Sequence, residues 1–174
     1  MPPSPDRLVG LASHTRPTSL ARTHLLPLPG ELWPLFGEPG IQRGAVLAIT
    51  NAVPARANPC TYGASSLATW VVSKISPTGA WCAVVNFPEF SPQLAYREGL
   101  CLDRSVFIPW PPMSVVDTVS TLLEGFDLVL LRLSHRLGHG STKQITSIAR
   151  HNRCLLVEHL LPTRPVDRDI PWAS

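Results

Sequence analysis

Five short apolar segments, separated by helical segments, constrain the fold of this 174-residue chain more than any other feature. The predicted strands are 45–50, 81–86, 105–109, 126–131 and 153–158. The predicted helices between them are 65–75, 92–98, 114–124 and 141–150. Such alternation is typical of βαβ units, in which parallel strands carry helices on both faces of the sheet. We therefore expect an α/β fold of three layers with a mainly parallel central sheet, and we expect its first strand, apolar on both faces, to be covered on both sides.

The composition predicts one compact domain with two tails. Hydrophobic residues make up 44% of the chain and charged residues 16%, which suits a single sizeable core. We place this core at 26–162, after a flexible basic N-terminal tail at 1–25 and before a C-terminal tail at 163–174. The N-terminal tail is either a disordered terminus, a basic arm that touches nucleic acid or a partner, or an organellar transit peptide.

The sequence also bears on location and on charged partners. No apolar run approaches the roughly 20 residues that cross a bilayer, so no membrane association is expected. The first 25 residues lack the apolar stretch of a secretory signal, and the four cysteines are interpreted as reduced thiols. Both observations predict a cytoplasmic protein. The net charge of +3 permits nucleic-acid binding without favouring it, because the arginines are scattered.

The first strand leads into a degenerate phosphate-binding loop. A P-loop reads G-x-x-x-x-G-K-[ST] between a strand and a helix. Here Gly63 is followed by Ala64 in place of lysine, and then by Ser65 and Ser66, while Asn58 replaces the first glycine. The missing lysine removes a contact worth about 1.5–3 kcal/mol, which weakens nucleotide binding roughly 10- to 150-fold. The loop is also too long to wrap one phosphate, so no cofactor is expected, and a serine is the predicted N-cap of the next helix.

The position that should hold a metal carries a cation instead. Arg132 follows the strand at 126–131, where a P-loop enzyme needs an aspartate for Mg²⁺. Arg132 either pairs with Asp127 or Glu89, or mimics the charge of the lost metal, or is an ordinary surface arginine at a strand end. Glu89 is either a general base or a solvated carboxylate. We predict no catalytic residue and no metal site, and therefore no enzymatic activity.

Two groups of side chains are candidates for contacts with DNA or with a protein partner. One is a basic loop, expected at the same sheet edge as the degenerate P-loop, and its alternative is a solvated loop. Its members are Arg132, His135, Arg136, His139 and Lys143. The spacing of the two histidines is also compatible with a metal, but no other ligand lies nearby in sequence. The other group is Trp110 and Trp172, which lie outside regular elements and either anchor an interface or pack on the core.

The order of these segments resembles the core of RecA-type proteins over about residues 28–160. The resemblance lies in the approach to the first strand, the degenerate turn, the segment joining strands two and three, and the strand before Arg132. These are residues 37–46, 63–67, 95–104 and 126–131. The resemblance implies a RecA-like three-layer fold. The phosphate-site residues of RecA cannot be carried over, because Ala64 and Arg132 occupy the key positions.

Within that superfamily the chain is most similar to degenerate members. These are the ImuA-type accessory proteins of bacterial mutasomes, especially the actinobacterial form, and the SulA cell-division inhibitors. The first resemblance implies a partner of an error-prone polymerase subunit in damage-induced mutagenesis. The second implies an inhibitor of the tubulin-like division protein. We favour a non-catalytic adaptor in DNA repair, with a weak ATPase and a SulA-like inhibitor as the alternatives.

Overall fold

The computed structural model describes residues 25–37, 39–50 and 62–161. Their main feature is a five-stranded sheet in the order β3-β7-β6-β4-β5, in which every pairing is parallel. Its strands are β3 (Val46–Thr50), β4 (Cys82–Val85), β5 (Ser105–Ile108), β6 (Leu128–Leu133) and β7 (Leu155–Leu160). This confirms the predicted α/β fold with a parallel central sheet.

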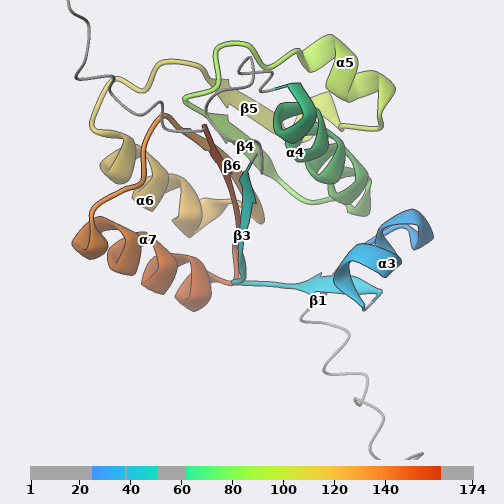
Figure 1. Ribbon diagram of the computed structural model, residues 1–174, viewed down its shortest axis with the longest axis horizontal. Helices are drawn as coiled ribbons and strands as arrows, with labels where there is room; N and C mark the ends of the chain where they lie inside the picture. Colours follow the sequence, from blue (N-terminus) through green and yellow to red (C-terminus); the bar gives the residue numbers. More distant parts are fainter. Residues whose placement is uncertain (1–24, 38, 51–61, 162–174) are drawn as a thin grey trace, which may run out of the picture.

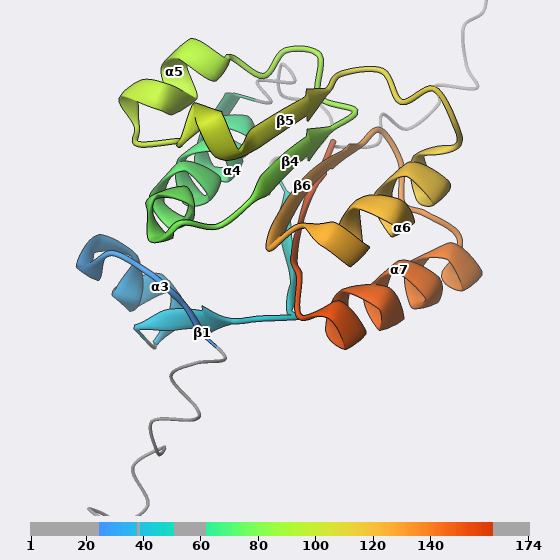
Figure 2. The same ribbon diagram turned by 180° about the vertical axis from the view of Figure 1, so that it is seen from behind.

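Helices cover both faces of the sheet and complete three layers (Figure 1, Figure 2). One face carries α4 (Tyr62–Ile75) and α5 (Pro92–Arg97). The other face carries α6 (Val115–Gly125) and α7 (His139–Asn152). Short 3-10 turns lie at Gly30–Leu32, Ser76–Thr78 and Leu102–Arg104.

Two hydrophobic cores lie on opposite faces of the sheet because side chains alternate along each strand. On β6, Leu128 and Leu130 belong to the core under α4, whereas Val129 and Leu131 belong to the core under α6 and α7. All four are essentially fully buried. Burial of each such side chain contributes about 1.5–3 kcal/mol, so this central strand holds both layers of helices.

A small hairpin precedes the sheet and was not predicted. β1 (Leu25–Pro27) pairs antiparallel with β2 (Gly40–Gln42), and a short helix, α3 (Trp33–Phe36), lies between them. Gly37 ends this helix in a left-handed conformation, with φ of 70°. Strands of three residues are too short for a two-residue periodicity to reveal them.

The expectation that the first strand is covered on both sides is wrong. β3 lies at the edge of the sheet and pairs with β7 alone. Val46 is 36% exposed, and Ile49 is the one buried residue of this strand. An apolar run predicts a strand, but its place in the sheet depends on pairings between segments far apart in sequence.

Several element boundaries also differ from the prediction. β6 ends at Leu133 rather than 131, because Leu133 pairs with Leu160 and packs in the core. Asp127 just precedes β6, where it forms an ion pair of 2.5 Å with Arg43 and accepts a hydrogen bond of 3.0 Å from the Trp81 N–H. These contacts join the amino-terminal ends of the strands. The predicted tails at 1–25 and 163–174 lie almost wholly outside the described residues, so the domain limits stay a prediction.

Candidate functional site

Three strands deliver a side chain to the carboxyl edge of the sheet, where ligands bind in open α/β folds. Arg132 lies near the end of β6, His159 is its register partner on β7, and Phe87 follows β4. Register partners project from the same face of a sheet. That face is the one under α4, because Leu130, two residues before Arg132, belongs to the α4 core.

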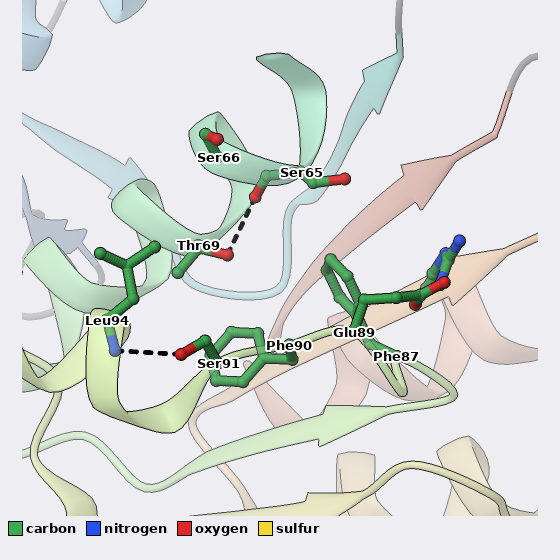
Figure 3. Close-up of a pocket in the computed structure, with 9 residues that line it drawn as sticks. Ser65, Ser66, Thr69, Phe87, Glu89, Phe90, Ser91 and Leu94 are labelled. Carbon is green, nitrogen blue, oxygen red and sulfur yellow. Dashed lines mark hydrogen bonds and ion pairs between the residues drawn. The ribbon is translucent and has the colours of Figure 1, made fainter. Parts of the chain in front are cut away.

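These side chains form a compact group, which we name the Arg132–Phe87–His159 cluster. The Arg132 guanidinium lies 5.3 Å from the centroid of the Phe87 ring. The Phe87 and His159 rings are stacked, with centroids 5.3 Å apart and planes 13° from parallel. Glu89 forms an ion pair with Arg132, and Ser65 Oγ lies 3.4 Å from His159 Nε2. Figure 3 shows Ser65 on the helix side of the adjoining pocket and Glu89 beside Phe87.

Burial keeps the imidazole of this cluster neutral. His159 is fully buried, and this burial lowers its pKa to about 4, with the charge of Arg132 acting in the same direction. Burial also lowers the pKa of Arg132, which nevertheless remains a cation at neutral pH. His159 Nδ1 has no hydrogen-bond partner among the described residues. Within that part of the chain, Ser65 and His159 therefore have no acid to orient the base of a nucleophilic triad.

The position of the missing phosphate lysine is part of the core. α4 begins at Tyr62, so Gly63, Ala64, Ser65 and Ser66 all lie within the helix rather than in a loop. The prediction that a serine caps this helix is therefore wrong. Ala64 is 4% exposed and packs in the α4 core. Asn58 and most of the loop before α4 lie outside the described residues.

The position where a P-loop enzyme has its metal-binding aspartate is occupied by Arg132, which forms an ion pair with Glu89. Arg132 lies within β6 rather than after it, and its side chain is 15% exposed. Of the two predicted acidic partners, Glu89 is the one that pairs with it, whereas Asp127 pairs with Arg43 at the opposite end of the sheet. The reading of Arg132 as an ordinary surface residue is wrong. Since its carboxylate is held in this ion pair, Glu89 is poorly placed to serve as a base.

Two adjoining hollows lie beside the cluster. The first, of about 310 Å³, lies between the start of α4 and the segment that follows β4, and includes Arg132, Glu89 and Phe87 in its lining (Figure 3). The second, of about 520 Å³, is a more apolar groove between α4 and α5, with Trp70 and Leu94 in its walls. The two share Ser66, Thr69 and Leu94.

The predicted basic loop does not form one cluster. Arg132 faces the α4 side, whereas Arg136 lines a separate hollow of about 390 Å³ with Glu158 and residues of α7. His135 is exposed before α7, and Lys143 is exposed on that helix. Leu133 and Leu160, at the carboxyl ends of β6 and β7, line the same hollow as Arg136, so Arg136 lies at the predicted edge of the sheet but not beside Arg132. Arg132 lies on β6, whereas the other candidates lie in the loop before α7 or on α7 itself.

Of the two candidate tryptophans, only Trp110 lies among the described residues. Trp110 is 74% exposed after β5, close in sequence to Met113, which is 57% exposed. The alternative that Trp110 packs on the core is wrong. Trp172 lies outside the described residues.

Metal and thiol chemistry find little support in the described part of the chain. No group of three or more metal-ligating side chains occurs there. His135 precedes α7 and His139 begins it, so the two do not share a helical turn. Burial raises the pKa of Cys154 to about 12 and that of Cys82 further, which keeps both thiols protonated.

No helix among the described residues is long and apolar enough to cross a membrane.

Sequence reasoning missed Phe87 and His159. A histidine within an apolar strand was an available signal, because a buried imidazole needs a partner. Phe87 gave no such signal, since an aromatic residue after a strand is common in any core. Only the register between β6 and β7 brings His159 next to Arg132.

The sheet order and the altered phosphate edge define an α/β protein of RecA-like architecture. SulA from Pseudomonas aeruginosa has a similar structure, with a TM-score of 0.54 and 13% identity over 67% of this chain and 98% of SulA. The RadB recombinase is similar with a TM-score of 0.51 and 20% identity, over 75% of this chain and 66% of RadB. At such identities both likenesses show the fold alone.

The chain belongs to the family described as the MT3502 N-terminal domain, whose model matches residues 34–163. An uncharacterized protein of Mycobacterium tuberculosis (strain ATCC 25618 / H37Rv), Rv3395c, is 30% identical over 96 residues. That match covers 55% of this chain and 47% of the relative, so the chain spans about half the length of this curated relative.

Proposed function

We propose that this protein is a non-catalytic, RecA-like accessory protein in DNA repair and damage-induced translesion mutagenesis. In this role it joins other proteins and turns over no nucleotide, so it is not an enzyme and uses no cofactor. Its proposed partner is the error-prone polymerase subunit of a mutasome, as the resemblance to ImuA-type proteins implies. DNA is the second partner to be tested.

The observation that carries this proposal is the Arg132–Phe87–His159 cluster at the carboxyl edge of the sheet. A RecA-like ATPase needs a lysine for phosphate and an acid for Mg²⁺ at this edge. Here Ala64 is buried in the first position and a cation paired with Glu89 occupies the second. Bringing Mg²⁺ beside Arg132 would add like-charge repulsion in a half-buried site, which opposes binding. Loss of both contacts favours a role that needs no nucleotide.

Exposed apolar side chains support a protein partner. Trp110 and Met113 project from the segment after β5 without burial. Leu94 and Tyr96 of α5 are also exposed, and Leu94 lines the apolar groove against α4. Aromatic and methionine side chains are enriched in the cores of protein interfaces.

Affinity capture with the purified polymerase subunit tests the main proposal. We expect the wild-type chain to retain the subunit, and Trp110→Ala with Met113→Ala to lose at least tenfold in affinity, as hot-spot truncation does. Trp81→Ala is the matched control, because Trp81 is an exposed aromatic at the opposite end of the sheet. Absence of any capture by the wild-type protein would contradict the proposed partnership.

Two alternative functions have separate tests. A weak ATPase would release heat on titration with millimolar ATP and Mg²⁺, whereas our proposal expects none. A SulA-like inhibitor of cell division is favoured by the likeness to SulA, which covers 98% of that chain. It would cause filamentation when the protein is overproduced, and normal division under those conditions removes it.

A further inference from the structure

The outer face of α7 is basic and carries no acidic residue. The helix contains Lys143 and Arg150 but neither aspartate nor glutamate, and Arg136 and Arg153 lie just before and just after it. All four side chains are exposed. None of them belongs to an ion pair within the described part of the chain.

Helix geometry aligns the two cations that lie on α7 itself. Lys143 and Arg150 are seven residues apart, which places them within about 20° of each other around the helix and about 10.5 Å apart along it. His139 lies four residues before Lys143 and so shares this stripe. Ile145 and Ala149 are fully buried against the sheet, so the stripe points to solvent. We call it the α7 basic stripe, with Lys143 and Arg150 at its centre.

The chemistry of the stripe favours a polyanion over a protein or a membrane. None of the large apolar side chains that are exposed in the described residues belongs to α7. The stripe therefore lacks the apolar anchors on which protein interfaces depend. A membrane-surface helix would need its apolar face free, whereas the apolar face of α7 is buried in the core. What remains is two aligned cations with the hydroxyl of Ser147 nearby, and such groups contact phosphates in nucleic acids.

The surrounding acids leave the centre of the stripe positive. Glu158 lies near Arg136 and its charge interacts with that guanidinium. Glu124 of α6 lines a hollow with Ser147 and His151. Neither acid is within ion-pair distance of Lys143 or Arg150.

We infer that the α7 basic stripe binds the phosphate backbone of DNA without reading its sequence. The inference rests on the proposed function for the choice of DNA among polyanions. α7 covers the opposite face of the sheet from α4 and α5 (Figure 2). DNA on the stripe would therefore leave the groove between α4 and α5 open to a protein. This assignment moves the DNA contact away from Arg132, whose charge is held by Glu89.

The test measures binding of a fluorescein-labelled oligodeoxythymidine, and of its duplex with oligodeoxyadenosine, by fluorescence anisotropy between about 50 and 200 mM salt. The variant is Lys143→Gln with Arg150→Gln. We expect it to bind roughly tenfold more weakly for each lost contact. The slope of log affinity against log salt should fall by about 1.4 on the single strand or about 1.8 on the duplex. The control is Lys74→Gln with Arg97→Gln, which removes the same two charges from α4 and α5 on the other face.

The control pair should retain wild-type affinity to within about twofold, since distant charges are screened at these salt concentrations. Equal weakening by both double variants would overturn the assignment to α7. So would an absence of DNA binding by the wild-type protein, or equally effective competition by a polyglutamate peptide. Thermal denaturation of each variant establishes that it is folded. Polymerase capture is measured separately with the same variants, so failure of the DNA inference and failure of the proposed function are distinguishable.

Discussion

Replacing His159 by glutamine should flatten the pH dependence of folding stability. The pKa of this imidazole is about 4 in the folded protein, against an ordinary value of 6.5, because the ring is buried beside Arg132. In the unfolded chain this imidazole therefore becomes protonated as the pH falls through 6.5. In the folded chain it stays neutral until the pH approaches about 4. Stability from this site is complete above about pH 7 and is lost as the pH falls toward 4.

The magnitude follows from the difference between the two pKa values. Each pKa unit corresponds to about 1.36 kcal/mol, so the full loss is about 3 kcal/mol, of which about 2 kcal/mol has occurred by pH 5. The raised pKa of Glu158 acts in the opposite direction, because a folded state that binds its proton more tightly gains stability as the pH falls. Glu158 is present in both proteins, so its effect largely cancels in the comparison.

The assay is urea denaturation of the wild-type and His159→Gln proteins at several pH values between 5 and 8. We expect the wild type to lose about 2 kcal/mol more than the variant between pH 8 and pH 5. His151→Gln is the control, because His151 is an exposed histidine on α7. Parallel stability curves for wild type and His159→Gln would refute the reasoning and show that this imidazole titrates normally in the folded chain.

Three further predictions concern single positions. Ala64→Lys should lower the melting temperature sharply and give no heat with millimolar ATP, because the residue is 4% exposed and burial of an ammonium in this core is costly. ATP binding by this variant would contradict the proposed function. Gly44→Ala should destabilise by about 1–3 kcal/mol in urea, since Gly44 has φ of 84° and a Cβ there would lie 3.1 Å from the Arg150 Cα. Leu130→Ala should lose about 2.7–5 kcal/mol in the same assay, because this fully buried side chain lies in the α4 core; a loss below about 1 kcal/mol would contradict the packing.

Much of the fold could be predicted from local sequence patterns. The run of apolar residues in β6 and the helical spacing of Val119 and Leu123 in α6 each identified an element correctly, because both periodicities are local properties of the chain. The hairpin of β1 and β2 could not be found in this way, since each strand has three residues. The edge position of β3 also escaped prediction, because it is decided by pairing with β7, more than a hundred residues later.

The candidate site could likewise be predicted only in part from the sequence. The identities of Ala64 and Arg132 were enough to predict that the usual phosphate and metal contacts are missing. They could not predict that Phe87 and His159 would assemble around Arg132, because these residues come from three separate strand ends. Nor could they predict that Arg132 and Lys143 would lie on opposite faces of the sheet.

The sequence by itself therefore determined the class of fold and the lack of the P-loop lysine and the metal-binding aspartate at positions 64 and 132. Both depend on residue identity and on spacing within single segments. The tertiary structure decided what occupies the phosphate edge and which cations form no ion pair with another described residue. Those outcomes depend on the strand register that pairs Arg132 of β6 with His159 of β7, and on which face of the sheet each side chain projects from. Strand register and the face that a side chain occupies both depend on segments far apart in the sequence. They become fixed only when the parallel strands pair and the helices pack upon them.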